Sequence, residues 1–115
     1  MLTFIEYPKC STCKKAKKYL DDKGLKHKDR HIVEERLSKE EIKKLHEKSG
    51  YPLKRFFNTS GMKYRELRLK DKLPDMTTDE QYELLASDGM LVKRPIIETH
   101  NKVLVGFKTA EYDEL

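Results

Sequence analysis

The feature that most constrains this chain is a pair of cysteines that separates a predicted strand from a predicted helix. Residues 2–7 form an apolar, β-prone segment that ends at Pro8. Apolar residues then recur at helical spacing over residues 11–23, and a glycine follows as the C-terminal stop. The Cys-x-x-Cys motif of residues 10–13 therefore lies at the start of the first helix.

This placement suits thiol chemistry. At a helix N-terminus, free backbone N–H groups and the helix dipole stabilise a thiolate, which is the nucleophilic form of cysteine. Lys9 and Lys14 add positive charge beside the motif. We therefore assign Cys10 as the nucleophile and Cys13 as the resolving thiol that attacks a mixed disulfide. The helical pattern predicts that Cys13 is the more buried of the two.

The middle of the chain is predicted from capping residues and apolar spacing. Residues 25–32 are interpreted as a second extended segment. Capping boxes at residues 38–41 and 77–80 open two helices, which we expect to stop near Gly50 and Gly89.

The C-terminal part predicts a hairpin. Residues 51–73 indicate short helices, and residues 96–98 and 103–105 flank a polar turn in which Asn101 suits a position of positive φ. A βαβ unit followed by helices and a β-hairpin predicts an α/β, thioredoxin-like fold with a mixed four-stranded sheet. We expect a single domain over residues 1–115, with a helical insertion over approximately residues 37–90.

Composition excludes several classes of protein. No apolar run approaches the roughly 18 residues of a membrane span, and residues 1–7 are too short for a signal peptide. We therefore expect a cytoplasmic protein with no membrane partner, in a compartment that keeps thiols reduced. The formal net charge is +5, but 20 acidic residues are interspersed with 25 Lys and Arg, so a solvated surface is favoured over direct nucleic-acid binding.

A zinc site is the main chemical alternative, because His27 and His31 follow the cysteines at a spacing typical of zinc fingers. Here the cysteines open a helix, and extended chain would separate the two histidines by about 13 Å, too far for one metal ion. This objection requires residues 27–31 to be extended. We expect no metal and no bound cofactor. His46 is expected on a helix surface and His100 in a turn, without an assigned role.

Two further segments accompany the cysteine motif. The sequence LVKRPII occupies residues 91–97, before the hairpin, and VGF occupies residues 105–107, after it. With these motifs the chain resembles the arsenate reductase (ArsC)/Spx family over about residues 4–107. The resemblance implies a thioredoxin-like fold with a helical insertion.

The resemblance also implies a set of site residues. Pro95 would follow a cis peptide bond beside the active cysteine. Arg94 would point at Cys10, lower its pKa and donate hydrogen bonds to an oxyanion or a cysteine oxidation product. Ser11 and Thr12, between the cysteines, would shape the site.

Arsenate reduction itself is disfavoured. The arsenate reductases that the chain resembles lack the second cysteine of the motif and use two further arginines to hold the oxyanion. This chain has no arginine in residues 56–60 or 104–107, where those arginines would align.

Spx-type regulators, in contrast, carry Cys-x-x-Cys. They bind the C-terminal domain of the RNA polymerase α subunit and use the cysteine pair as a redox switch. Their docking surface includes a glycine after the second long helix, where Gly50 stands here, although a glycine at that place also serves as a plain helix stop. This sequence ends at Leu115, whereas those regulators usually have an extended C-terminal tail.

Two functions therefore stay open. The leading prediction is a monomeric thiol–disulfide oxidoreductase of the glutaredoxin-like or ArsC-like type, which glutathione or thioredoxin would restore to the dithiol. The alternative is a redox-sensing regulator that binds the RNA polymerase α C-terminal domain.

Overall fold

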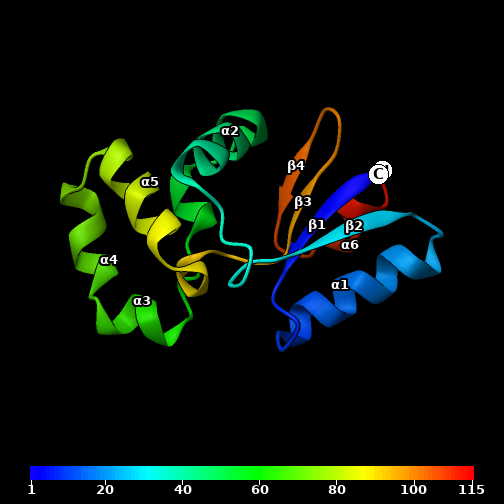
Figure 1. The fold of residues 1–115 in the computed structure, drawn as a ribbon, viewed down its shortest axis with the longest axis horizontal. Helices are drawn as coiled ribbons and strands as arrows, with labels where there is room; N and C mark the ends of the chain where they lie inside the picture. Colours follow the sequence, from blue (N-terminus) through cyan, green and yellow to red (C-terminus); the bar gives the residue numbers. More distant parts are fainter.

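The computed structural model describes all 115 residues and contains one mixed sheet with the strand order β2-β1-β3-β4 (Figure 1). Strand β1 (Leu2–Glu6) pairs in parallel with β2 (His27–His31), and helix α1 (Ser11–Asp22) connects the two. On its other side β1 pairs antiparallel with β3 (Ile96–Glu98), which pairs antiparallel with β4 (Val103–Val105). The predicted thioredoxin-like plan, a βαβ unit plus a hairpin, is confirmed.

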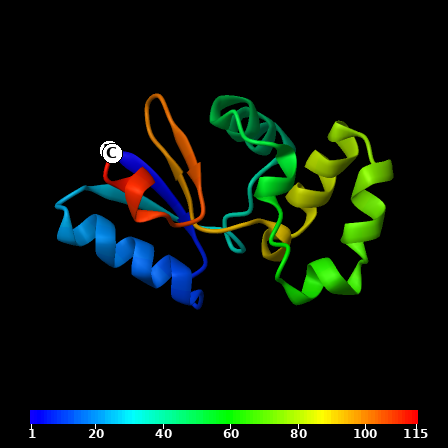
Figure 2. The ribbon, with the colours of Figure 1, turned by 180° about the vertical axis from the view of Figure 1, so that it is seen from behind.

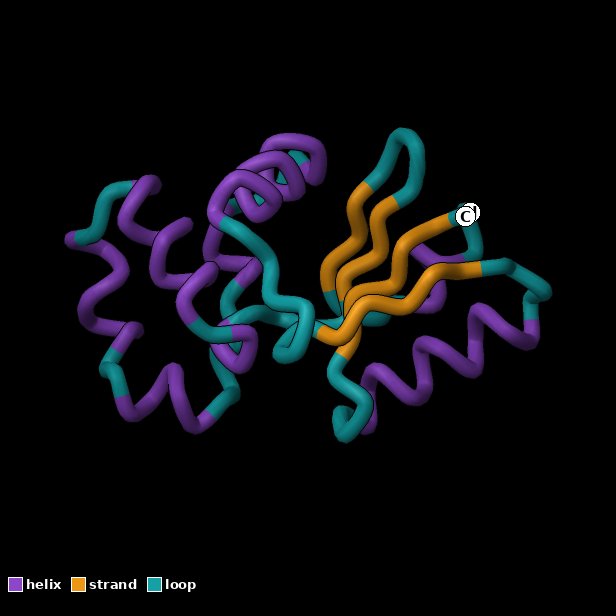
Figure 3. Tube along the Cα trace, viewed as in Figure 1, coloured by secondary structure: helices purple, strands orange, loops and turns teal.

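Helices occupy the chain between β2 and β3, in the region predicted to hold an insertion, and form a group beside the sheet (Figure 3). In chain order they are α2 (Lys39–Ser49), η1 (Leu53–Phe56), α3 (Met62–Glu66), α4 (Leu69–Lys72), η2 (Leu73–Asp75), α5 (Thr78–Ser87) and η3 (Gly89–Leu91). A last short helix, α6 (Thr109–Tyr112), follows β4. No helix is both long and apolar enough to cross a bilayer.

The two faces of the sheet bury two separate apolar clusters, because side chains alternate along a strand. Leu2 and Phe4 of β1 belong to a cluster of seven buried residues that packs the sheet against α1 and α6 (Figure 2). Ile5 belongs to a cluster of 17 buried residues that joins the opposite face to the inserted helices. Strand β1 therefore lies between two cores.

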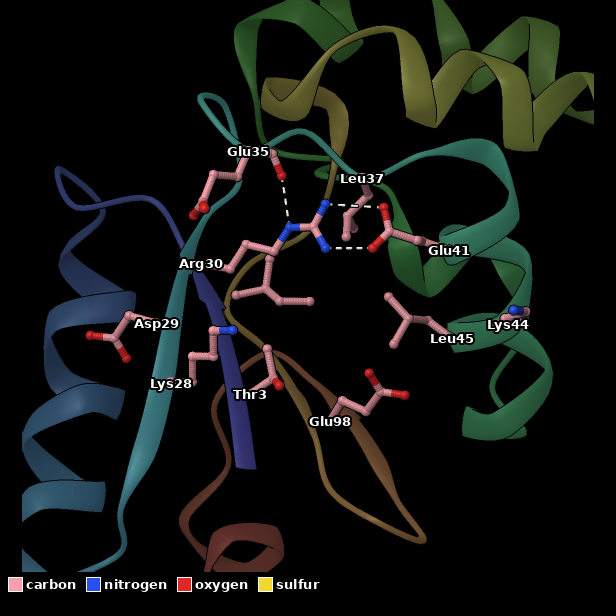
Figure 4. A pocket seen from close by; sticks show the side chains of 11 residues that line it. Thr3, Lys28, Asp29, Arg30, Glu35, Leu37, Glu41, Lys44, Leu45 and Glu98 are labelled. Atoms are coloured by element: carbon pink, nitrogen blue, oxygen red, sulfur yellow. Dashed lines mark hydrogen bonds and ion pairs between the residues drawn. The ribbon is translucent and has the colours of Figure 1, made fainter. Parts of the chain in front are cut away.

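An ion pair fastens the edge strand β2 to helix α2 (Figure 4). The guanidinium of Arg30 donates to the carboxylate of Glu41 at 2.5 and 3.0 Å, and to the carbonyl of Glu35 at 2.8 Å. The Glu41 carboxylate also accepts the N–H of Ser38 at 2.9 Å, which completes the predicted capping box. This group closes one end of a cavity of about 410 Å³ between the sheet and α2.

Both predicted helices stop near the expected glycines. Gly50 follows α2 in a left-handed conformation with φ 71°, as expected of a C-terminal glycine. Helix α5 ends at Ser87, two residues before Gly89, which begins η3. Gly89 lies directly against the chain after β2, since a Cβ placed on it would be 2.3 Å from the carbonyl oxygen of Ile32.

Two smaller predictions were wrong. Asn101 does not have positive φ, because the side chain of Thr99 shapes the hairpin turn by accepting the N–H groups of Asn101 and Lys102 at 3.3 and 3.0 Å. His46 is not on an open helix surface. It is half-buried between α2 and α5, where its Nδ1 lies 2.6 Å from the hydroxyl of Tyr82.

We predict that Glu41→Gln removes an acid-sensitive part of the stability. Hydrogen bonds from Arg30 lower the pKa of Glu41 from 4.5 to about 2, so the carboxylate stabilises the fold above about pH 4.5 and loses this effect as the pH falls toward 2. The substitution should cost only about 1 kcal/mol at neutral pH, because the pair is partly exposed. The cost should be smaller at pH 2 to 3, where Glu41 takes up a proton. Urea unfolding at several pH values measures both effects. Glu40→Gln is the matched control, since Glu40 lies in the same helical turn without an ion pair, and an equal cost for the two variants would contradict the prediction.

Candidate active site

Cys10 is the N-cap residue of α1. Pro8 ends the strand, and the chain turns so that the Cys10 N–H donates to the carbonyl of Tyr7 at 2.9 Å. The Cys10 sulfur then accepts the N–H of Cys13 at 3.3 Å, which is the bond that a serine or aspartate makes at an ordinary N-cap. The thiol is half-exposed, so a substrate can reach it.

The two thiols differ in ionisation. Partial burial acts to raise the pKa of Cys10, but hydrogen bonds from Cys13 and the charge of Arg94 outweigh it, and the net pKa lies below the ordinary value of a cysteine. Cys13 is fully buried, and burial together with the neighbouring Cys10 raises its pKa to about 12. Cys10 therefore ionises first, and both cysteines are free thiols.

Arg94 is held beside this pair by neutral groups. Its Nη1 donates to the carbonyls of Met90 and Val92 at 3.3 and 3.5 Å, and its Cζ lies 5.2 Å from the centre of the Tyr7 ring. The peptide bond from Arg94 to Pro95 is cis, as the sequence resemblance implies. The charge of Arg94 contributes to the lowered pKa of the Cys10 thiol, and the direct approach of Arg94 to Cys10 stays a prediction.

Cys10 opens onto a cavity of about 660 Å³ between the N-terminus of α1 and the inserted helices. Thr12 and Arg94 line the same cavity. Ser11 is exposed but lies outside the lining, Pro95 is buried, and Cys13 lies beneath the surface. Three of the six predicted site residues, Cys10, Thr12 and Arg94, therefore line the cavity. The other three are their neighbours in the sequence. Their individual roles remain predictions.

Several cavity residues escaped sequence reasoning. The inserted segment contributes Asn58, Ser60, Lys63, Asp88 and Lys93 to the lining. These residues are scattered over residues 58–93 and share no motif, so only their spatial convergence identifies them. From residues 56–60, which contain no arginine, the cavity takes the amide of Asn58 and the hydroxyl of Ser60.

The extended backbone on which the argument against a zinc site depends is present. His27 and His31 lie at the two ends of strand β2, as predicted from the extended pattern. The ring of His27 contacts the carboxylates of Asp21 and Asp29 at 2.8 and 2.5 Å. Burial acts to lower the pKa of His27, but the two carboxylates outweigh it, and the net pKa lies above the ordinary value. His31 instead accepts backbone N–H groups from Val33 and Glu34, so the two histidines serve separate contacts.

Comparison with known proteins identifies one matching family model and several relatives that align over nearly the whole chain. A model of the ArsC family matches residues 5–115. The chain is 61% identical over 113 residues to the uncharacterized protein YusI of Bacillus subtilis, covering 98% of this chain and 96% of that protein. It is 29% identical over 112 residues to the global transcriptional regulator Spx of Listeria monocytogenes, covering 96% of this chain and 83% of that protein.

Two solved structures share the whole fold. An ArsC family related protein from Bacteroides fragilis has a TM-score of 0.96 at 50% identity, covering 98% of this chain and 95% of that chain. A possible arsenate reductase from Streptococcus mutans UA159 has a TM-score of 0.90 at 49% identity, covering 99% of this chain and 97% of that chain.

We predict that Arg94→Ala raises the pKa of Cys10, because it removes a positive charge and a hydrogen-bond donor from the thiolate. Alkylation of Cys10 at neutral pH should slow by about tenfold, and the thiolate absorbance should appear at higher pH. Lys93→Ala is the matched control, since Lys93 lines the cavity but does not contribute to the lowered pKa. An unchanged titration in Arg94→Ala would remove Arg94 from the site.

Proposed function

Because this chain belongs to the ArsC family, we propose that it is a thiol–disulfide oxidoreductase that uses Cys10 and Cys13 as a redox-active dithiol. One observation carries the proposal. A half-exposed thiol with a lowered pKa lies at a cavity, directly above a fully buried thiol with a raised pKa. This asymmetry fits a nucleophile and a resolving partner.

The first step is attack by the Cys10 thiolate on a substrate disulfide. A bond forms between the Cys10 sulfur and one substrate sulfur, the substrate S–S bond breaks, and the other half leaves as a thiolate that takes up a proton. The Cys13 N–H, 3.3 Å from the Cys10 sulfur, and the Arg94 guanidinium favour the thiolate before attack.

The second step is resolution by Cys13. In the dithiol the neighbouring Cys10 contributes to the raised pKa of Cys13. Once Cys10 is held in a mixed disulfide its negative charge is gone, so that part of the shift disappears while the charge of Arg94 still favours the Cys13 thiolate. Cys13 then gives its proton to the leaving sulfur, forms the Cys10–Cys13 disulfide and releases the second substrate half as a thiol.

An external thiol must return the pair to the dithiol. Two glutathione molecules, or the dithiol of one thioredoxin, supply the two electrons and two protons and become a disulfide themselves. These reductants belong to the cytoplasm, where we expect the chain to act. The cycle needs no bound cofactor.

The cavity favours a disulfide over arsenate as the substrate. Arg94 is the one arginine in its lining. Arg55, next to the segment in which an oxyanion-binding arginine would align, is turned away, because it donates to the carbonyl of Val105 at 3.1 Å and lies 4.2 Å from the centre of the Tyr51 ring. An oxyanion would thus find one arginine where three are expected.

We predict turnover with a glutathione mixed-disulfide substrate, followed through a reductase-coupled NADPH assay. Cys10→Ser should lower the rate by at least about a hundredfold, because it removes the nucleophile. With a substrate disulfide, Cys13→Ser should accumulate a mixed disulfide on Cys10, visible as an added mass. Lys15→Ala is the control, since Lys15 is exposed on α1 and outside the cavity lining. Retained turnover in Cys10→Ser would contradict the proposal.

A redox-sensing regulator is the second candidate, favoured by the likeness to Spx and by the surface around Gly50. Gly50 is exposed at the end of α2, with no atom within 4 Å of where a Cβ would lie. A partner such as the RNA polymerase α C-terminal domain could therefore approach the backbone there. Oxidation of Cys10 and Cys13 to a disulfide would then alter the surface offered to that partner.

If the regulator function holds, the reduced or the oxidised protein should capture the polymerase α C-terminal domain, and Gly50→Arg should abolish capture by obstructing the surface. Gly24→Arg is the matched control, because Gly24 is also exposed, has φ 73° against 71° at Gly50, and has nothing within 4 Å. Both variants carry the same backbone strain. Absence of capture in both redox states would exclude this candidate.

A further inference from the structure

We propose that Tyr7 is a positioning residue that holds the Arg94 guanidinium beside Cys10 without neutralising its charge. The Arg94 Cζ lies over the Tyr7 ring at 5.2 Å from the ring centre, within the range of a cation–π interaction. Tyr7 also reaches the nucleophile through its backbone, since its carbonyl accepts the Cys10 N–H at 2.9 Å. One residue thus contacts both members of the charge pair.

An aromatic ring, unlike a carboxylate, can hold the Arg94 guanidinium without weakening its electrostatic effect on the Cys10 thiolate. Arg94 forms no ion pair with a carboxylate, and its other partners are the carbonyls of Met90 and Val92. A carboxylate in the place of the ring would hold the guanidinium equally well but would cancel much of its field at Cys10. An aromatic face supplies attraction without net charge.

Asp88, one of the two acidic residues in the lining, has partners other than Arg94. One carboxylate oxygen of Asp88 accepts the N–H of Met90 at 2.9 Å, and the other lies 4.0 Å from the Nζ of Lys63. The titratable and charged groups around Cys10 are Cys13, Arg94, the sequence neighbours Tyr7, Lys9 and Lys14, and the cavity residues Lys63, Glu66, Asp88 and Lys93. Of these, Cys13 and Arg94 contribute to the shifted pKa of the Cys10 thiol.

The Tyr7 ring is itself fixed by the end of strand β2. The ring of His31 meets it edge to face, with centres 5.8 Å apart at 89°. His31 is fixed in turn, because its Nδ1 accepts the N–H groups of Val33 and Glu34, each at 3.1 Å. The chain of contacts therefore runs from β2 through His31 and Tyr7 to Arg94.

The hydroxyl of Tyr7 makes no hydrogen bond in the structure, so the ring alone accounts for the contact with Arg94. Phenylalanine should replace tyrosine without loss, and an aliphatic side chain should not. The positioning role of Tyr7 deepens the proposed function, and it rests on that function only for the use that the protein makes of a reactive thiolate. A titration of the thiol tests it independently of turnover.

The experiment measures the rate of iodoacetamide alkylation of Cys10 against pH, with the modified residue identified by mass spectrometry. Tyr7→Leu should slow alkylation at neutral pH by about two- to fivefold and move the titration to higher pH, while Tyr7→Phe should match the original protein. In an Arg94→Ala background, Tyr7→Leu should have no further effect, because its action passes through Arg94.

Two controls separate positioning from packing. Tyr19→Leu removes a half-buried tyrosine of α1 that lies over Lys23 and not over Arg94, and it should leave the titration unchanged. If Tyr7→Leu does not fold, Tyr7→Met removes the ring with an unbranched side chain and gives the same test. A titration unchanged by loss of the ring would overturn the inference, as would a shift that persists in the Arg94→Ala background. If the titration behaves as expected but the mixed-disulfide assay shows no turnover, the proposed function fails and the positioning role of Tyr7 stands.

Discussion

Strand β1 is the constraint on which both halves of the molecule depend. Phe4 and Ile5 are neighbours in sequence, and both are almost fully buried, but on opposite faces of the sheet. A slip of one residue in the pairing of β1 would exchange the two faces and leave neither core filled. The same register fixes where the strand ends and therefore where Cys10 enters the N-terminus of α1. The position of the nucleophile is thus set by apolar burial several residues away.

The candidate site lies where the two halves meet. The cysteines belong to the βαβ half, whereas Arg94 and the carbonyl of Met90 come from the end of the inserted segment. Gly89 sets the distance between the halves, because any larger residue would collide with the carbonyl oxygen of Ile32. A larger residue at position 89 would displace η3 and, with it, the carbonyl of Met90, which accepts a hydrogen bond from Arg94. The electrostatic environment of the thiol therefore depends on how closely the inserted helices pack against the end of β2.

Local chemistry explains why so much of this arrangement could be predicted from the sequence. The Cys-x-x-Cys motif, Pro8 and the capping boxes act through neighbours in the chain, so the positions of α1, α2 and α5 follow from them. The contacts of Gly89 and His46 could not be predicted in this way, because distant segments provide them: a close backbone approach in one case and the hydroxyl of Tyr82 in the other. The prediction of positive φ at Asn101 was wrong for a different reason, since the side chain of Thr99, two residues earlier, shapes the turn. The lining contributed by the insertion has no periodicity at all, and only the folded chain brings it to Cys10.

The difference between the two thiols is relevant to an enzyme and to a regulator alike. In the dithiol, the Arg94 guanidinium faces a half-exposed thiol that ionises easily, above a buried thiol that does not. Closing the disulfide would remove the thiolate and leave the guanidinium with the Tyr7 ring and the two carbonyls that hold it in the dithiol, at the edge of an open cavity. Its positive charge, balanced by the thiolate in the reduced state, would then be available to solvent or to a partner. In an oxidoreductase this change is transient and ends when a reductant arrives. In a regulator the same change would persist long enough to be recognised, so the two functions differ in the lifetime of the disulfide and in what binds beside it, and share the chemistry of the site.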